Sequence, residues 1–458
     1  MFIFSNTPAM NLYCILFLLA AILKFSDSCL VIRYSEPPAC ACKTLKLDLW
    51  NIAENHGEPY LLYNSVMWST IKSPEILVED CFVQVYCEDG ADLYIFDTGK
   101  GAKIGDYSLD GFCDPYQQAW QVDTGNGIEQ YKELKAVCVL KPKCSPTDPA
   151  VFLYAYSADL DKWDAPGVIS LWDQAMYFGA TTKYAIAATV RFDTKVKEEI
   201  VFHENETFYD SQIIGYWHME AQEENPPQTF DSPEIGSDIL EVLERFVGSN
   251  HPLVCGSMIL IAMRRYPNEV DISKIVEKLR ENQITVVIAA LDTPTGGLHP
   301  ETMYDLAAKT NGICAYTHDL LLAPNTAPTI LDPFIVYSLN LKVSGTGTMV
   351  LPKILLQDTF TVHLSIAVQS TGTANSFQSL KFSFRNNELG ASGSVEKTRD
   401  DLKYTAELFR NSFKVWNFLL AEPTFFEFTL DYNYSMEDTI LIRLISERGI
   451  GHWFPYQD

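Results

Sequence analysis

Hydroxyl and carboxylate side chains after a buried strand are the first residues whose types and spacing could support chemistry. The stretch "VFLYAYSADL" (151–160) has the pattern of an apolar strand that ends in a polar turn, and Ser157 and Asp159 stand in that turn. In an open parallel sheet, ligands bind beyond the carboxyl ends of the strands. Ser237 and Asp238 open a later helical segment. The four side chains can hydrogen-bond a polar partner. The competing interpretation is structural, with Ser237 as a helix N-cap and Asp159 closing the turn.

Catalytic chemistry has little support elsewhere in the chain. A nucleophile needs a histidine and a carboxylate that converge on it, and "VCGSM" around Cys255 resembles neither a nucleophile elbow nor a papain-type cysteine. Cys255 is expected to pack as a small hydrophobic residue in a strand. Cys314 opens the last strand of the same region, and an intervening strand would hold the two cysteines about 10 Å apart, too far for a disulfide. The histidines are scattered, and no phosphate-binding loop is present. We therefore expect no enzyme and no cofactor.

The cysteines indicate an exported protein. Eleven are present, and removal of a leader would take Cys14 with it. An even, dense cluster in an exported segment predicts a disulfide framework, and the spacings do not match zinc sites. The eight candidates in this framework are Cys29, Cys40, Cys42, Cys81, Cys87, Cys113, Cys138 and Cys144. Their connectivity stays open at this point.

The amino-terminal 28 residues predict a signal peptide. The apolar run "LYCILFLLAAIL" (12–23) is too short to span a bilayer comfortably, and the small residues Ser26 and Ser28 precede the expected cleavage before Cys29. The pattern departs from a typical leader because no Lys or Arg precedes the apolar run. We expect a secreted, extracellular chain without a transmembrane segment, glycosylated at Asn205 ("NET") and Asn433 ("NYS").

Composition restricts the partners. The 458 residues suffice for about three domains, and the formal net charge of −25 repels phosphate backbones and anionic lipid. Nucleic acid is therefore an unfavourable partner. We expect an extracellular protein or glycan instead.

Three regions of different character follow the leader (1–28) and must position these side chains. Residues 29–145 form a small disulfide-rich β module, in which "CFVQVYC" is a strand with Cys81 and Cys87 on one face. Residues 150–322 alternate strands and helices, which predicts an α/β doubly wound sheet. Residues 330–458 contain the separate β-rich segments "FIVYSLNLKVSG", "FTVHLSIAVQS", "LKFSFRN", "FFEFTLDYNYS" and "DTILIRLIS". Several are separated by turn residues such as "GTGT", "STGT" and "RNNELG", which predicts an antiparallel β-sandwich.

Within the middle region, the strands are expected at "YAIAATVRF" (184–192), "SMILIAM" (257–263) and "ITVVIAAL" (284–291) as well as at 151–157. The helices are expected at "GVISLWDQAMYF" (167–178), "SDILEVLERFV" (237–247), "DISKIVEKLREN" (271–282) and "HPETMYDLAAKTNG" (299–312).

The order of these elements resembles a von Willebrand factor A domain over roughly residues 150–320. The resemblance rests on "GSMILIAMRRYPNEVDISKIVEKLRENQITVVIAALD" and "TMYDLAAKTNGICAY". It implies a metal site at the rim, whose first motif falls on Ala155, Ser157 and Asp159 and whose threonine position falls near Ser237. In that site an aspartate stands at the position of Ala155 and another at that of Met263. A Mg²⁺ ion needs a nearly complete set of oxygen ligands. We therefore expect a degenerate site that holds no metal.

The stretches "VCGSMILIAMRRYPNEVDISKIV", "KTNGICAY" and "VSGTGTMVLP" also look like a family of secreted nematode proteins of unknown function. That family implies architecture and secretion, and no catalytic residues. The sequence is thus interpreted as a secreted, non-enzymatic binding or adhesion-type protein. The alternatives are an extracellular hydrolase with a dispersed site and a structural matrix component.

Overall fold

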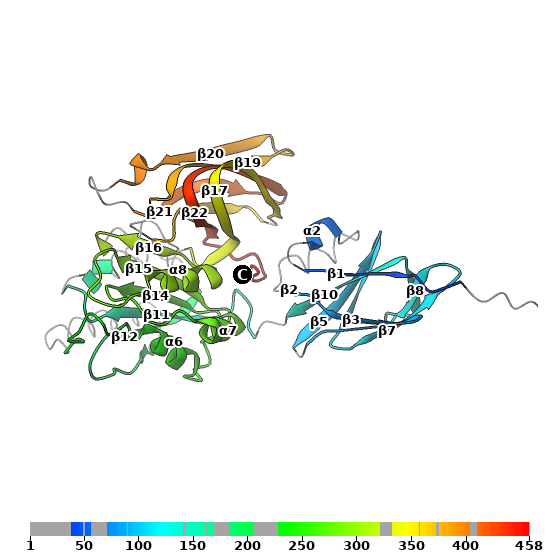
Figure 1. The fold of residues 1–458 in the computed structure, drawn as a ribbon, viewed down its shortest axis with the longest axis horizontal. Coiled ribbons are helices and arrows are strands. Elements are labelled where there is room, and N and C mark those ends of the chain that lie inside the picture. Colours follow the sequence, from blue (N-terminus) through cyan, green and yellow to red (C-terminus); the bar gives the residue numbers. More distant parts are fainter. Residues whose placement is uncertain are drawn as a thin grey trace, which may run out of the picture.

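The computed structural model describes residues 38–48, 51–55, 71–88, 90–140, 143–161, 164–165, 167–168, 183–204, 228–320, 332–356, 358–371, 375–403 and 410–457. Strands make up most of the elements in these ranges. The predicted leader, Cys29, Asn205 and most of the expected helix at 167–178 lie outside them. The chain forms an N-terminal β module, a central α/β unit and a C-terminal β unit (Figure 1).

The N-terminal module packs two antiparallel-rich sheets face to face. One sheet has the order β1-β10-β5-β6, with β2 on β10, and the other has the order β3-β4-β7-β8-β9. The first sheet contains β1 (Lys43–Lys46), β2 (Ile71–Lys72), β5 (Ala91–Asp97), β6 (Lys100–Gly105) and β10 (Glu133–Leu140), and the short helix α2 (Ile52–Asn55) precedes β2. The second contains β3 (Glu75–Glu79), β4 (Phe82–Tyr86), β7 (Leu109–Asp114), β8 (Ala119–Asp123) and β9 (Ile128–Tyr131).

Period-two alternation decides which side chains fill this module. In β4, Val83 and Val85 are buried while Phe82, Gln84 and Tyr86 are exposed, as expected for a strand with one face on the core. Both cysteines that flank β4 pack against the same core as Val83 and Val85. The prediction for "CFVQVYC" is therefore confirmed.

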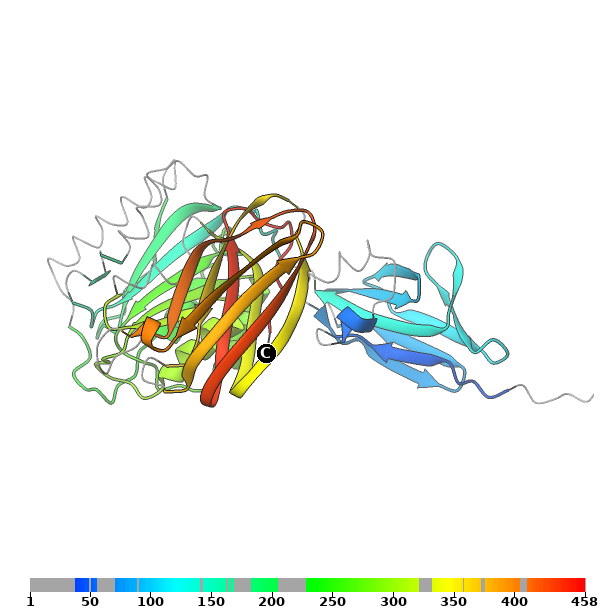
Figure 2. The same ribbon diagram turned by 90° about the horizontal axis from the view of Figure 1, so that it is seen from above.

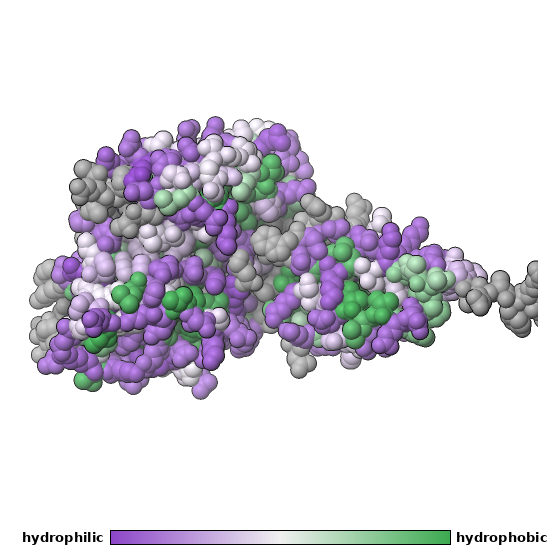
Figure 3. Space-filling model, viewed as in Figure 1, coloured by the Kyte–Doolittle hydropathy of each residue, from purple (hydrophilic) through white to green (hydrophobic). Residues whose placement is uncertain are grey.

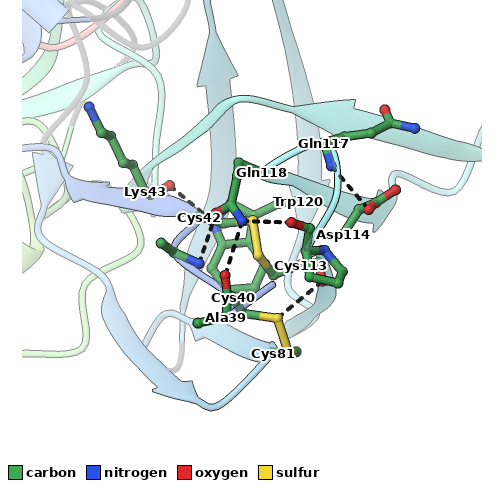
Figure 4. Close-up of a disulfide and its surroundings, with 12 residues drawn as sticks. Ala39, Cys40, Cys42, Lys43, Cys81, Cys113, Asp114, Gln117, Gln118 and Trp120 are labelled. Carbon is green, nitrogen blue, oxygen red and sulfur yellow. Dashed lines mark hydrogen bonds between the residues drawn. A yellow bond between two sulfur atoms is a disulfide. The ribbon is translucent and has the colours of Figure 1, made fainter. Parts of the chain in front are cut away.

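Three disulfides link segments of the module, and hydrogen bonds from Gln118 and Trp120 lie beside two of them (Figure 4). They join Cys40 to Cys81, Cys42 to Cys113 and Cys87 to Cys138. The Gln118 amide accepts from Ala41 N at 2.9 Å and donates to Ala39 O at 3.0 Å. The Trp120 indole donates to Lys43 O at 2.9 Å. These bonds hold the Cys-Ala-Cys segment against the second sheet.

The fourth disulfide corrects two expectations. Cys144 does not pair within the N-terminal framework but bonds to Cys255, just before a central strand of the α/β unit. Cys255 is therefore not a packed free thiol. Cys314 is the free cysteine of the described residues, and it is buried. The Trp453 indole also donates to Cys144 O at 2.7 Å, so the segment after the N-terminal module is anchored to both other units.

The α/β unit is built on a six-stranded sheet of order β13-β12-β11-β14-β15-β16. Its strands are β11 (Ala150–Ser157), β12 (Tyr184–Phe192), β13 (Val201–His203), β14 (Met258–Met263), β15 (Thr285–Leu291) and β16 (Cys314–Thr317). All neighbours pair in parallel except the antiparallel edge strand β13. Numbered within the unit, the order is 3-2-1-4-5-6, which is that of an open doubly wound sheet. This sheet confirms the four strands expected at 151–157, 184–192, 257–263 and 284–291.

Three helices cover one face of this sheet: α6 (Ile239–Val247), α7 (Ser273–Glu281) and α8 (Pro300–Lys309). Their buried residues share one cluster with alternate residues of β11, including Leu153 and Ala155. The other residues of β11, including Tyr154 and Tyr156, belong to a second cluster with Ala165 and Val168. Both faces of the strand are therefore buried, which explains its continuous apolar run.

Two very long strands run side by side through the C-terminal unit (Figure 2). β17 (Phe334–Leu355) and β22 (Phe425–Ser446) pair antiparallel, and β22 also pairs with β18 (Phe360–Ala367) and β19 (Phe377–Asn386). β20 (Ala391–Thr398) and β21 (Ser412–Ala421) pair with β19 and β18, respectively. The short 3₁₀ helix η3 (Asp400–Leu402) follows β20.

Two expected breaks in this unit are wrong. "GTGT" lies inside β17, where the register shifts between Val343 and Gly345, and Gly345 adopts φ 67°. A bulge with a glycine in this conformation bends a strand without ending it. "FFEFTLDYNYS" and "DTILIRLIS" likewise form one strand. "RNNELG" is the turn between β19 and β20, as predicted. Residues 372–373 of "STGT" lie outside the described part of the chain.

Arg443 of β22 joins the C-terminal unit to the end of α8. Its guanidinium is buried and donates to Asn311 O and Gly312 O at 2.9 Å each, to Leu339 O at 2.8 Å and to Asn340 Oδ1 at 2.8 Å. Arg443 Nη2 also donates to Ala308 O at 3.4 Å in the last turn of α8, where the negative end of the helix dipole favours a cation. Burial lowers the pKa of Arg443 to about 9.

Replacement of Arg443 by Met should lower the stability of the joined units. The apolar side chain leaves several buried acceptors without a donor, at a cost of roughly 3–5 kcal/mol. Arg443→Lys should recover only part of this loss, because an ammonium group has fewer donors than a guanidinium group. Arg385→Met is the control, since Arg385 is exposed and pairs with Glu427 at 2.8 Å. Urea unfolding in which Arg443→Met and Arg385→Met behave alike would contradict this prediction.

Candidate functional site

The rim at the carboxyl ends of β11, β12 and β14 is the first candidate site, and it brings all four predicted side chains together. The Ser157 hydroxyl donates to Asp193 Oδ2 at 2.5 Å. Asp193 N donates to Asp238 Oδ1 at 2.8 Å, and Asp238 N donates to Asp193 Oδ1 at 3.3 Å. The Ser237 hydroxyl acts on the same carboxylate and lowers the pKa of Asp193. Asp193, which follows β12 directly, thus connects Ser157 after β11 with Asp238 at the start of α6.

Arg265 completes the other side of the rim. Its Nε donates to Asp159 Oδ2 at 2.7 Å, and Thr295 Oγ1 donates to the same oxygen at 2.5 Å. Arg265 Nη1 donates to the carbonyls of Ser232 and Ile235 at 2.9 and 2.7 Å. The Arg265 and Asp159 side chains are only 3% and 5% exposed. A guanidinium cation and its acceptors therefore already occupy this part of the rim.

A glycine makes room for that guanidinium. A Cβ at Gly296 would collide with Arg265 Nη1, and the Gly296 carbonyl accepts from Tyr266 N at 2.9 Å. The next residue, Gly297, adopts φ 82° and lies directly against the Tyr266 carbonyl. The loop after β15 is thus shaped around the residues that follow β14.

The buried carboxyl of Asp193 is the titratable group of the rim. Burial raises the pKa of Asp193 to about 7, against the opposing effect of the hydrogen bonds from Ser157 and Ser237. The negative charges of Asp238 and Asp159 raise it further. The charge of Asp193 therefore changes close to neutral pH, while its carboxyl group is hydrogen-bonded to Ser157 and Asp238.

Ala155 and Met263 lie where the resemblance places metal-binding aspartates. Both side chains are fully buried and belong to the cluster between the sheet and α6, α7 and α8. Among the described residues, no group of three His, Cys, Asp or Glu side chains is placed to hold a metal ion. The absence of a metal remains a prediction.

The structure changes one assignment at the rim and adds three residues. The N-cap of α6 is Asp238, without a side-chain cap bond, whereas Ser237 Oγ accepts from Ile239 N at 3.3 Å. Ser237 is therefore not the cap residue expected from the sequence. Asp193, Arg265 and Thr295 were not predicted, although each follows a strand that was. The rule that carboxyl ends of parallel strands share one rim could have identified all three.

The second candidate site is the outer face of the sheet β3-β4-β7-β8-β9, called the outer face below. Phe82 and Phe112 are 63% and 42% exposed, and their rings meet edge to face with centroids 5.5 Å apart. Leu77 and Tyr86, also exposed, stand on the same face by the registers of β3, β4 and β7. A hydrophobic area is visible over the strands labelled β3 and β7 (Figure 3).

The opposite sheet of the module, β1-β10-β5-β6, has apolar side chains that are covered by other parts of the chain. Tyr94, Phe96 and Val137 of that sheet are buried with Leu47 and with Ile52 of α2. Exposed apolar patches on soluble proteins often mark interaction sites. The outer face is therefore the stronger binding surface of the two candidates, since the rim groups bond to one another.

One of the two predicted glycosylation acceptors can be placed. Asn433 lies exposed on β22, where its Oδ1 accepts from Thr346 Oγ1 at 3.1 Å. Asn205 lies outside the described residues. The glycosylation of both remains a prediction.

Residues 339–447 match the model of a Domain of unknown function (DUF7154). The match runs from β17 to the end of β22, so the chain carries this domain in its C-terminal unit. No curated protein matches the chain. Among solved structures, the human COPII-coat protein Sec24c is similar at 6% identity with a TM-score of 0.27, over 66% of this chain and 44% of that protein. The chain thus spans less than half of that protein's length, and a likeness at this level supports no inference about function.

No helix in the described part of the chain is long and apolar enough to cross a membrane. The four disulfides fit a secreted or extracellular protein, because such bonds persist in oxidising compartments.

Replacement of Asp193 by Asn should flatten the pH dependence of stability. The pKa of Asp193 is raised in the fold, so the stability that it contributes is complete below about pH 4 and is lost as the pH rises through about 7. Asn removes this titration and tolerates the left-handed backbone of Asp193, which has φ 62°. Thermal unfolding across this pH range measures the effect. Asp161→Asn, at an exposed position of the loop after β11, serves as the control. An unchanged pH profile for Asp193→Asn would contradict the assignment.

Proposed function

We propose that this chain is a secreted, non-enzymatic binding protein that holds an extracellular partner on the outer face of its N-terminal module. The exposed Phe82–Phe112 pair carries the proposal. Aromatic side chains dominate the energetics of protein interfaces, and burial of exposed apolar area is favourable by roughly 25 cal/mol per Å². Three disulfides stiffen the sheet beneath this pair, which lowers the entropy cost of binding.

The hydrogen bonds at the rim of the α/β sheet argue against a catalytic role for these groups. The Asp159 carboxylate is engaged by Arg265 and Thr295, and the Asp193 carboxyl is engaged by Ser157 and Asp238. Catalytic groups need geometry directed at a substrate. The groups of this rim are directed at one another.

We also infer that the α/β unit is a von Willebrand factor A-like domain with a degenerate metal site. The parallel sheet of order 3-2-1-4-5-6 with an antiparallel edge strand supports this assignment, as does the position of Arg265 at the rim. In this proposal, the guanidinium of Arg265 neutralises Asp159 in place of a bound cation. We propose in addition that the chain is related to the secreted nematode proteins of unknown function that its sequence resembles.

Divalent metal should leave the stability of the chain unchanged. Asp159 is already neutralised by Arg265, and Ala155 and Met263 offer no oxygen ligand. Thermal unfolding should therefore coincide in EDTA and in excess Mg²⁺ or Ca²⁺. A metal-dependent rise in the melting temperature that Asp159→Ala or Asp238→Ala abolishes would show that a relocated metal site exists.

Binding of an extracellular partner should depend on the two phenylalanines. The mature chain is immobilised and exposed to extracellular fluid or matrix extract, and retained proteins are identified by mass spectrometry. Proteins retained by the native chain should be lost from the variant Phe82→Ser/Phe112→Ser. They should persist on Val350→Ser, which removes an 85% exposed apolar side chain from β17. Retention that is identical on all three chains would contradict the proposal.

A further inference from the structure

We infer that the partner of the outer face is a basic polypeptide segment, in which arginine or lysine side chains alternate with apolar ones. This inference rests on the proposed function and adds the chemistry of the partner. It is carried by the charge that surrounds the exposed aromatic residues.

The five described strands of the outer face contribute carboxylates and no Lys or Arg side chains to it. The strands β3, β4, β7, β8 and β9, all of them fully described, contain six acidic residues and no Lys or Arg. The six are Glu75, Glu79, Asp110, Asp114, Asp123 and Glu129. The registers place all of them except Glu129 on the outer face. Lys46 of the other sheet reaches Glu75 at 3.1 Å, and both side chains of that pair are largely exposed.

The acidic residues stand around the apolar ones. Glu79 pairs in register with Phe82, and Phe82 pairs with Phe112 across β4 and β7. Asp110 lies two residues from Phe112 on the same strand and the same face. An apolar side chain of a partner can therefore contact the two rings while its neighbouring cations meet Glu79 and Asp110. Arginine adds a favourable contact with the aromatic faces.

The same charges disfavour other occupants. A second copy of this chain would bring identical rows of carboxylates together, and like charges across an interface are strongly unfavourable. Acidic glycans, nucleic acid and anionic lipid are repelled for the same reason. A basic segment is attracted, and its association should weaken as salt rises.

The test uses the full mature chain and three short labelled peptides, with binding followed by fluorescence anisotropy. The first peptide alternates arginine with leucine, the second alternates glutamate with leucine, and the third alternates arginine with serine. Only the arginine–leucine peptide should bind tightly. Phe82→Ser/Phe112→Ser should weaken its binding by at least about tenfold, the loss expected for central aromatic contacts. Val350→Ser should have no effect.

Charge-reversal variants distinguish binding at the outer face from attraction to the net negative charge of the whole chain. Glu79→Lys/Asp110→Lys should weaken binding of the arginine–leucine peptide much more than Glu396→Lys/Glu437→Lys, which makes the same change in net charge at exposed positions of the C-terminal unit. Equal losses in the two variants, or binding that ignores the phenylalanines, would show non-specific attraction and overturn the inference.

Two further outcomes would overturn the inference and leave the proposed function standing. One is phenylalanine-dependent binding of the glutamate–leucine peptide at equal strength, which would show that the face accepts a partner of another charge. The other is a dimer in sedimentation that Phe82→Ser/Phe112→Ser dissociates, which would make a second copy of the chain the occupant.

Discussion

The buried guanidinium of Arg443 is the interaction on which the joining of the α/β and C-terminal units depends. A desolvated cation is costly unless acceptors surround it, and here carbonyls at the end of α8 and in β17 provide them. Neighbouring amides extend the contact: Asn311 Nδ2 donates to Phe454 O at 3.0 Å, and Asn411 Nδ2 donates to Cys314 O at 3.0 Å. Leu441 of β22 also packs into the core of the α/β unit. The end of α8 and the end of β22 are thus held in one arrangement.

The need of a buried cation for hydrogen-bond acceptors also explains the arrangement of side chains at the rim of the parallel sheet. Arg265 is buried and therefore needs acceptors, and Asp159 with the carbonyls of Ser232 and Ile235 provides them. These groups are satisfied within the protein, so little hydrogen-bonding capacity remains for a ligand. The outer face of the N-terminal module is the opposite case. Its aromatic rings remain exposed, and within the described ranges Lys46 is the cation that pairs with one of its carboxylates, Glu75. Both kinds of group can therefore gain free energy from a partner.

Much of the α/β unit could be predicted because a parallel sheet imposes a local signature. Strands buried on both faces must be continuously apolar, and the helices between them must be amphipathic. The predicted segments therefore match β11, β12, β14 and β15, and the rule about their carboxyl ends placed Ser157 and Asp159 at the rim. The long strand β17 was missed because glycines inside a bulge have the same local pattern as glycines in a turn. Only pairing with a neighbouring strand distinguishes the two. β22 has no glycine and was divided at residues 435–437, which lie opposite that bulge.

The sequence by itself determined the alternation of buried and exposed residues, the cysteine-rich character of the first region and the continuous apolar strands that contain Ala155 and Met263. Each of these is a property of residue type at short range, which local periodicity makes visible. Only the tertiary structure decided that Cys144 bonds to Cys255, that Arg265 neutralises Asp159 and that Arg443 meets the end of α8. In each of these pairs the partners lie about a hundred or more residues apart in the chain. Nothing in the local pattern of one partner identifies the other, because their contact is set by how whole sheets and helices pack.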